Sequence, residues 1–330
     1  MADEKADIQV GLRAATDMMQ KQEVSAILGP SSGPIVAMAS IADRYKTPII
    51  SQFAGTTNFS SVGGEYLFRT VASDASDGAA VAEYLSEEKA EDVVIIVQND
   101  QSTITAGSAA EERLEGVGST VLETIKYNPG QPSYQAVVQQ AVSANADAIY
   151  LAGGQESAIT ILREMRDLGI SSDEIIVSAD LVVPDVIEAL GADWADGLAG
   201  VTAKADDKRP QYVSLAKAYE KRYGEEPGIF VENAYDAVML VALAATAAES
   251  TCPAAVAEKL PEVAADGTAA TSFAEAAKAI AAGADVDYDG ASGPVDFDET
   301  GTVAGSYAVY QVTGGKWTVS KFYPAETFIE

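Results

Sequence analysis

Short apolar runs alternate with longer amphipathic segments over roughly the first two hundred residues. Runs rich in Val and Ile, which predict strands, lie at residues 24–29, 47–53, 91–99, 119–127, 146–153 and 173–180. The segments between them, such as "IVAMASIADRY" and "SAITILREMRDLG", carry apolar residues at helical spacing. Strands that alternate with helices of about 10–15 residues indicate βαβ units and a parallel sheet. Because these runs are apolar on both faces, we expect helices on both sides of the sheet.

The pattern changes after about residue 200. Residues 204–227 read as a charged helix with an exposed face, and residues 230–250 read as a nearly all-apolar helix that must be buried. The Ala- and Gly-rich stretch 266–294 predicts one more helix followed by a loop. Apolar and polar residues alternate on both sides of Gly314-Gly315, which predicts a β-hairpin over 305–324.

Length and charge narrow the class of protein. A chain of 330 residues has room for roughly two domains. Its formal net charge is −29, from 50 acidic and 21 basic residues, and it has no basic stripe of the kind that binds nucleic acid. Salt screens the self-repulsion of such a charge, so we expect a halophilic protein or one from an acidic medium. A merely acidic cytosolic protein is the alternative.

The reactive side chains are few. The chain has no histidine and one cysteine, Cys252, so Ser-His-Asp and Cys-His catalysis, thiolate metal clusters and disulfides are excluded. We expect no cofactor and no metal. The sequence also has no run of about 18 apolar residues that would span a membrane. Its first residues, "MADEKADIQV", lack the core of a signal peptide.

The loop "GPSSGP" at residues 29–34 follows the first predicted strand and precedes a helix. It lacks the lysine of a Walker loop and the third glycine of a dinucleotide fingerprint. A nucleophilic serine here would need a base, and only distant carboxylates are available. A helix N-terminus with serine hydroxyls attracts a small anion such as a carboxylate. The alternative is simple N-capping by Ser31 or Ser32.

Two further strand ends carry polar residues. Residues 54–58, "AGTTN", are small and include the hydroxyls of Thr56 and Thr57. Adjacent parallel strands that end in such loops form a ligand crevice in open α/β sheets. A third strand ends at Asp180, whose carboxylate could receive a ligand ammonium group. Its alternative role is to cap the helix near Pro184.

An ordered set of motifs resembles the branched-chain-amino-acid-type (Leu/Ile/Val-binding) substrate-binding proteins of ABC importers. The motifs are "AILGPSSG", "IADRYKTPIIS", "AGTTN", "FRTVASDASDG", "SANADAIYLAGGQESAITILREMRDLGI", "FVENAYDAVMLVALA" and "GPVDFDETGTVAGSYAVYQVTGGKW". The resemblance implies the α/β fold of type I periplasmic-binding proteins: two doubly wound parallel-sheet lobes joined by three crossover strands, with a ligand cleft between the lobes. The crossings match residues 70–73, 201–204 and 296–301. Lobe 1 would comprise 1–71 and 203–297, and lobe 2 would comprise 72–202 and 298–330.

The resemblance also implies a set of ligand contacts. In the first lobe, the loop with Ser31 and Ser32 and the stretch with Ala54, Thr56 and Thr57 would hold the carboxylate and ammonium groups of an amino acid. Asp180 in the second lobe would complete the ammonium site.

The chain departs from the family at two places in the second lobe and at its start. Where the family often places aromatic residues, this chain has Ile104, followed by Thr105, and Gly153-Gly154-Gln155. Ile104 and Gln155 are therefore candidate contacts in a changed side-chain pocket. Members normally begin with a signal or lipid anchor and with a first central strand and helix, which we expect to be missing here.

The functional hypothesis that follows is a binding protein, not an enzyme. It would be the extracytoplasmic solute-binding component of an ABC importer, and it would close its lobes on a branched-chain amino acid or a related small carboxylate. Its partners would be the permease subunits, and it would meet the membrane only through them or through an anchor absent from this chain. A ligand-sensing receptor or regulator domain on the same fold is the second hypothesis.

An α/β enzyme that uses carboxylates as acid or base is the third and weakest hypothesis. Its candidates, Asp74, Asp77, Asp100 and Asp180, lie on turns and helix starts, where capping is the commoner role.

Overall fold

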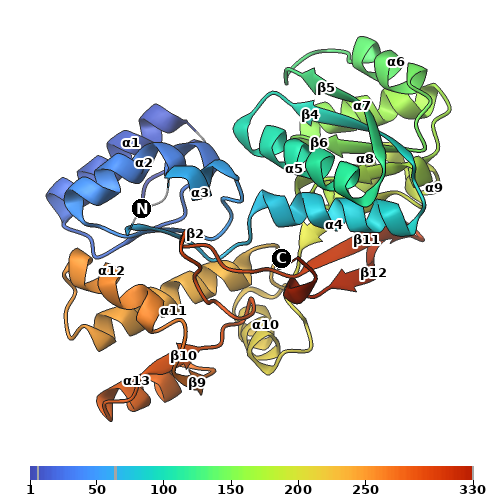
Figure 1. Ribbon diagram of the computed structural model, residues 1–330. Helices are drawn as coiled ribbons and strands as arrows, with labels where there is room; N and C mark the ends of the chain where they lie inside the picture. The colour runs from blue at the N-terminus through green and yellow to red at the C-terminus, as the bar shows by residue number, and fades with distance from the viewer. Residues whose placement is uncertain (6, 63–64, 329–330) are drawn as a thin grey trace. The chain divides into compact units, whose positions relative to one another are not determined.

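The computed structural model describes residues 1–5, 7–62 and 65–328. The chain forms two compact units (Figure 1). Unit 1 comprises residues 1–73 and 204–306, and unit 2 comprises residues 74–203 and 307–328. Of the three predicted crossings, those at 70–73 and 201–204 lie at the boundaries of the units. The crossing at 296–301 lies within unit 1, which the chain leaves after Ser306.

The N-terminal part of unit 1 is a small parallel sheet with helices packed on it. Strands β1 (Ile27–Leu28), β2 (Ile49–Ser51) and β3 (Leu67–Arg69) lie side by side in that order. The helices are α1 (Ile8–Asp17), the π-helical η1 (Met18–Gln22), α2 (Ser32–Tyr45) and α3 (Asn58–Val62). Ile35, Ile49 and Phe59 are fully buried in the core. The expectation that the first helix is missing is wrong, because α1 precedes β1 within a stretch that reads as charged. Strand β3 has no counterpart among the predicted strands, because it is only three residues long.

The rest of unit 1 is mainly helical. Its elements are α10 (Pro210–Tyr223), α11 (Val231–Ala247), α12 (Pro253–Glu262), β9 (Thr268–Ala270), α13 (Phe273–Ala281) and β10 (Val286–Tyr288). No residue of α10 is buried, which confirms the predicted exposed helix. The prediction that the 230–250 helix is buried holds for one of its faces. Only one face of α11 packs on the core, through Leu240 and Leu243, while Val238 is 50% exposed.

A buried carboxylate fixes the loop that follows β10. Asp236 of α11 is fully buried and accepts hydrogen bonds from the Tyr288 hydroxyl (3.0 Å) and the Ala291 N–H (2.9 Å). The N–H and hydroxyl of Ser292 donate to its other oxygen at 2.7 and 2.6 Å. A Cβ at Gly290 would lie 2.5 Å from this carboxylate, so only glycine fits there. Burial raises the pKa of Asp236, and the four donors offset that cost.

Unit 2 is built on a seven-stranded sheet in the order β12-β11-β8-β7-β6-β4-β5. Its strands are β4 (Asp92–Gln98), β5 (Thr120–Tyr127), β6 (Ala148–Ala152), β7 (Ile175–Val177), β8 (Ala199–Ala203), β11 (Tyr307–Thr313) and β12 (Lys316–Tyr323). Strands β5, β4, β6, β7 and β8 are parallel, which confirms the prediction from the alternating pattern. The predicted hairpin is also confirmed, as antiparallel β11 and β12.

Helices cover both faces of this sheet. They are α4 (Asp74–Glu87), α5 (Gln101–Val117), α6 (Gln135–Ser143), α7 (Gln155–Asp167), α8 (Pro184–Leu190) and α9 (Ala192–Ala195), with short 3₁₀ turns η2 (Ser172–Glu174), η3 (Ala179–Leu181) and η4 (Ala325–Phe328). Val94 and Ile96 of β4 belong to a core with residues of α6, α7 and α8. The alternate residue Val97 faces Gly107 of α5. The α/β class predicted from the sequence is therefore confirmed. Across the described ranges, every helix is too short or too polar to cross a membrane.

Candidate functional site

In unit 1, two loops leave the carboxyl ends of the neighbouring strands β1 and β2. Ser51, the buried last residue of β2, joins them. Its hydroxyl donates to the carbonyl oxygen of Pro30 in the first loop (2.7 Å) and accepts the N–H of Ala54 in the second (2.9 Å). The sequence analysis missed Ser51, although a serine that ends an apolar strand is a signal that could have found it.

The first loop already holds a carboxylate. The N–H of Ser31, the N-cap residue of α2, donates to a carboxylate oxygen of Glu4 at 2.8 Å. Ser31 makes no side-chain capping bond, and Ser32 is the buried first residue of the helix. The alternative of N-capping is therefore confirmed for the position of Ser31, although its hydroxyl makes no capping hydrogen bond, and it is wrong for Ser32. The carboxylate of Glu4 lies beside this N-cap residue, where the positive end of the helix dipole favours an anion.

The second loop presents a row of backbone donors. Ala54, Gly55 and Thr56 are buried, and Thr57 is half-buried. Within residues 1–5, 7–62 and 65–328, the N–H groups of Gly55, Thr56 and Thr57 meet no acceptor. Successive free N–H groups in a loop form a concave binding site for an anion. The Thr56 hydroxyl accepts the N–H of Asn58 (3.3 Å) at the start of α3.

A buried arginine lies beneath this loop. Arg69 of β3 is fully buried, and its Nη1 donates to the carbonyl oxygens of Ala54 (3.2 Å) and Thr56 (3.1 Å). Its guanidinium lies 4.7 Å from the centre of the Phe59 ring. The sequence analysis quoted this residue only within the motif "FRT" and gave it no role. An arginine inside a short apolar run was the available signal, because arginine is almost never fully buried unless its charge is paired or hydrogen-bonded.

In unit 2, Asp180 lies in η3, just after β7. It does not cap α8, whose N-cap residue is Val183 and has no side-chain capping bond, so the alternative role is wrong. Asp180 is an exposed residue. The protein around its carboxyl group and the nearby charge of Asp100 raise its pKa. An ammonium group brought to this carboxylate would relieve that repulsion.

Further carboxylates gather near this strand end. Asp100 caps α5 by accepting the N–H of Thr103 (3.0 Å), the role that the sequence favoured. Asp77 of α4 has an oxygen 3.4 Å from the Tyr150 hydroxyl. Burial and the adjacent charge of Asp74 raise the pKa of Asp77 to about 8, and Asp180 contributes to the shift. Asp77 therefore keeps a proton at neutral pH, and it is the neighbouring carboxylates of Asp180 and Asp100 that favour a cationic group at this edge of unit 2.

The two positions where the sequence departs from the family pattern lie at helix starts. Ile104 is half-buried in the first turn of α5, and Gln155 is the exposed first residue of α7. An aromatic side chain does lie nearby, but it comes from β5. The Tyr127 hydroxyl fills the space of a side chain at Gly153, where a Cβ would lie 1.9 Å from its oxygen. The sequence gives no sign of this contact, because Tyr127 lies on β5 whereas Gly153 follows β6.

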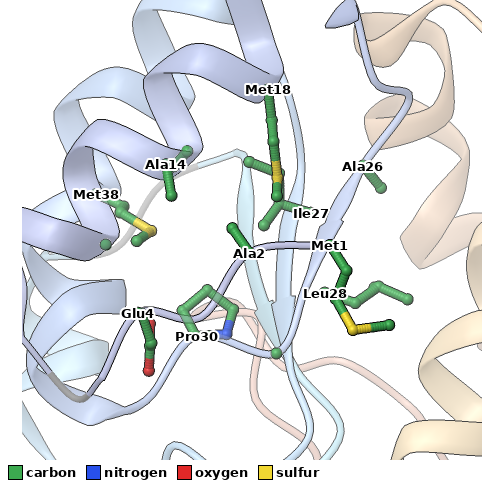
Figure 2. Close-up of a pocket in the computed structure, with 13 residues that line it drawn as sticks. Met1, Ala2, Glu4, Ala14, Met18, Ala26, Ile27, Leu28, Pro30 and Met38 are labelled. Carbon is green, nitrogen blue, oxygen red and sulfur yellow. The ribbon is translucent and has the colours of Figure 1, made fainter.

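Unit 1 also contains an apolar pocket of about 260 Å³, shown in Figure 2. The N-terminal segment, α1 and β1 enclose it, with Met18, Ile27 and Leu28 among its lining residues. The predicted ligand contacts are not among the residues that line it. Gly29 and Pro30 of the first loop and Glu4, which binds that loop, do line the pocket, so the pocket adjoins the first loop of unit 1.

Comparisons with known proteins agree with this architecture. The Leu-, Ile-, Val-, Thr- and Ala-binding protein of Pseudomonas aeruginosa is 25% identical over 214 residues, which are 64% of this chain and 57% of that protein. The chain therefore matches less than two thirds of that relative's length. The chemotactic signal transduction system substrate-binding protein BasB of Halobacterium salinarum is 25% identical over 323 residues, 94% of this chain and 75% of its own length.

Solved structures show the same fold. The leucine-binding protein LivK of Thermotoga maritima has a TM-score of 0.81 at 23% identity, over 98% of this chain and 87% of that one. LivJ of Streptococcus pneumoniae, solved with isoleucine, has a TM-score of 0.78 at 22% identity, over 98% and 85%. These likenesses confirm the predicted type I periplasmic-binding fold. A family model described as periplasmic binding protein matches residues 1–316, and the chain belongs to this family of binding proteins.

Proposed function

We propose that this protein is the extracytoplasmic solute-binding component of an ABC importer and that it binds a branched-chain amino acid or a related small carboxylate. The observation that carries the proposal is the row of N–H groups at Gly55, Thr56 and Thr57, which meet no acceptor in the described ranges. The adjacent loop supports it, since the N–H of Ser31 already binds a carboxylate, that of Glu4.

The polar ends of an amino acid fit the charges of the two units. The carboxylate would bind the N–H groups of unit 1, with the hydroxyls of Ser31, Ser32 and Thr57 nearby. The ammonium group would bind Asp180 of unit 2, where the nearby charge of Asp100 strengthens the attraction. In this proposal units 1 and 2 are the two lobes of the family, and a ligand held by both draws them together.

The ligand's side chain is proposed to meet Ile104 and Gln155. An isoleucine at the first of these positions offers apolar contact to an aliphatic side chain, whose burial is worth about 25 cal/mol per Å². The Pseudomonas protein is named for binding leucine, isoleucine, valine, threonine and alanine, and the Thermotoga protein for binding leucine, which supports the same ligand class. No turnover of the ligand is expected, and the permease subunits of an importer are the proposed partners.

A thermal-shift panel tests the proposal. The panel contains L-leucine, L-isoleucine and L-valine, together with 4-methylpentanoate, which is leucine without its amine, and 3-methylbutylamine, which is leucine without its carboxylate. A ligand present at about 100 times its dissociation constant adds about 2.7 kcal/mol to the free energy of unfolding. We expect stabilisation by at least one amino acid and by neither truncated compound at equal concentration. If 4-methylpentanoate stabilises the protein as strongly as leucine does, Asp180 does not bind the ligand's ammonium group. If no compound of the panel stabilises the protein, the ligand is not one of these amino acids.

A further inference from the structure

Arg69 is held on several sides by groups of unit 1. Its Nε donates to the Thr302 hydroxyl at 2.9 Å, while Nη1 donates to the carbonyl oxygens of Ala54 and Thr56. The Phe59 ring, 4.7 Å from the guanidinium carbon to its centre, adds a cation–π contact. The side chain is 0% exposed. Arg69 therefore joins the loop after β2 to the segment at residue 302, far away in sequence.

The two carbonyl contacts of Arg69 also determine where the backbone N–H groups of the loop point. In a trans peptide the C=O and the N–H of the next residue point in opposite directions, and no described peptide bond is cis. Because the carbonyls of Ala54 and Thr56 point at Arg69, the N–H groups of Gly55 and Thr57 point away from it. These are two of the three donors that meet no acceptor in the described ranges.

We propose that Arg69 is the positioning residue of the ligand-carboxylate site: by binding the carbonyls of Ala54 and Thr56 it aims the N–H groups of Gly55 and Thr57 at the ligand. The inference rests on the proposed function, because it assigns a cause to the geometry of that same site. Arg69 does not itself touch the ligand. Its buried positive charge lies behind the donors and adds to their attraction for an anion.

The chemistry of arginine suits this role better than that of lysine. A planar guanidinium carries five donors in a fixed arrangement, so it can bind two carbonyls and a hydroxyl at once, whereas an ammonium group is a compact charge on a flexible stem. Burying such a cation is unfavourable unless its hydrogen bonds are satisfied. A residue needed only to fill space between Phe59 and Thr302 would not require that charge.

The test compares Arg69→Lys with Thr302→Val. The lysine keeps the charge and loses the double contact with the loop, whereas Thr302→Val removes the acceptor of Nε and leaves both carbonyl contacts in place. The readouts are the amide ¹H–¹⁵N resonances of Gly55 and Thr57 in the ligand-free full chain, and calorimetric affinity for the amino acid that the thermal-shift panel identifies. We expect Arg69→Lys to move both resonances and to weaken binding by roughly tenfold or more, as lost hydrogen bonds to a charged group do. Thr302→Val should leave the resonances in place and the affinity within about twofold.

A purely structural role makes a different prediction. If Arg69 only stabilises the fold, both variants should have a lower unfolding midpoint, while the folded proteins keep their affinity for the amino acid and their Gly55 and Thr57 resonances. That result would overturn the proposal. If Arg69→Lys does not fold, the wild-type protein still decides: saturation with the amino acid must shift the amide resonances of Gly55 and Thr57, and unmoved resonances refute the assignment. Should the wild-type chain bind no amino acid, the proposed function fails, while the ligand-free resonances of the variants still report whether Arg69 orients the loop.

Discussion

The hydroxyl of Ser51 lies 2.7 Å from the carbonyl oxygen of Pro30 and donates a hydrogen bond to it. Both groups belong to unit 1, and the bond ties the end of β2 to the loop that follows β1. Because the same hydroxyl accepts the N–H of Ala54, one buried side chain sets the spacing of the two loops proposed to hold the ligand carboxylate.

Replacing Ser51 with alanine should therefore damage both stability and binding. The variant leaves a buried carbonyl and a buried N–H without partners, which costs about 1–3 kcal/mol of unfolding free energy. It also frees the two loops to move relative to each other, so we expect weaker amino-acid binding. Ser61→Ala is the matched control, because it removes an exposed serine whose hydroxyl donates to the local carbonyl of Asn58. Urea unfolding and calorimetry on both variants check the prediction, and equal behaviour of the two would contradict it.

Glu4 should compete with the ligand for the N–H of Ser31. Its carboxylate accepts that N–H at 2.8 Å in the structure, so a ligand carboxylate must displace it. Glu4→Ala removes the competitor, and we expect a several-fold gain in affinity for the amino acid by calorimetry. Glu65→Ala removes the same charge from an exposed position of unit 1 and serves as the control. If both variants bind as the wild type does, the ligand does not use the N–H of Ser31.

The stability of unit 2 should fall as the pH rises toward 8. Burial and the charge of Asp74 raise the pKa of Asp77 from 3.8 to about 8, so between these values the folded protein keeps a proton that the unfolded chain releases. The folded state then binds more protons, and the free energy of unfolding decreases with pH across this window. Asp77→Asn should flatten that decrease.

Tryptophan fluorescence measures this effect selectively, because both tryptophans of the chain, Trp194 and Trp317, belong to unit 2. Urea unfolding at pH 5 and pH 8 should show a larger loss of stability in the wild type than in Asp77→Asn. The exposed Asp193→Asn is the control and should lose as much as the wild type. An equal loss in all three proteins would show that Asp77 is ionised throughout this range.

High salt should stabilise the protein. A net charge of −29 on 330 residues produces self-repulsion in the compact state, and added salt screens it. We expect the thermal midpoint to rise steeply as potassium chloride increases to about 1 M, where the screening length is about 3 Å. Sucrose, which stabilises proteins by exclusion without screening charge, separates the two effects. A midpoint that responds to sucrose but not to salt would contradict a halophilic character.

Much of the fold could be predicted because its signals are local. The apolar runs of β4 and β6 and the Gly314-Gly315 hairpin lie within short windows of sequence, and their periodicity identifies them. The three-residue strand β3 has no such signal. The exposure of Val238 could not be predicted either, because it depends on which face of α11 packs on the core rather than on the composition of the helix.

Some residues of the candidate site could also be predicted from the sequence, and others could not. Ser31, Thr56 and Asp180 could be found because they follow recognisable strand ends. The residues that orient the loops could not, since their roles depend on distant partners: Arg69 bonds to Thr302, 233 positions away, and Tyr127 fills the space at Gly153 from another strand. The sequence identifies which groups are available, and the tertiary structure determines which of them point at one another.

The most direct test of the central claim is a calorimetric titration of the full chain with L-leucine, L-isoleucine and L-valine, alongside the variants Asp180→Asn and Asp193→Asn. We expect one ligand per chain for the wild type and for Asp193→Asn, with the ligand recovered chemically unchanged. We also expect a loss of at least about tenfold in affinity for Asp180→Asn, because an ammonium group loses its carboxylate partner. Equal affinities for the two variants, or no heat with any of the three amino acids from a folded wild-type protein, would contradict this claim.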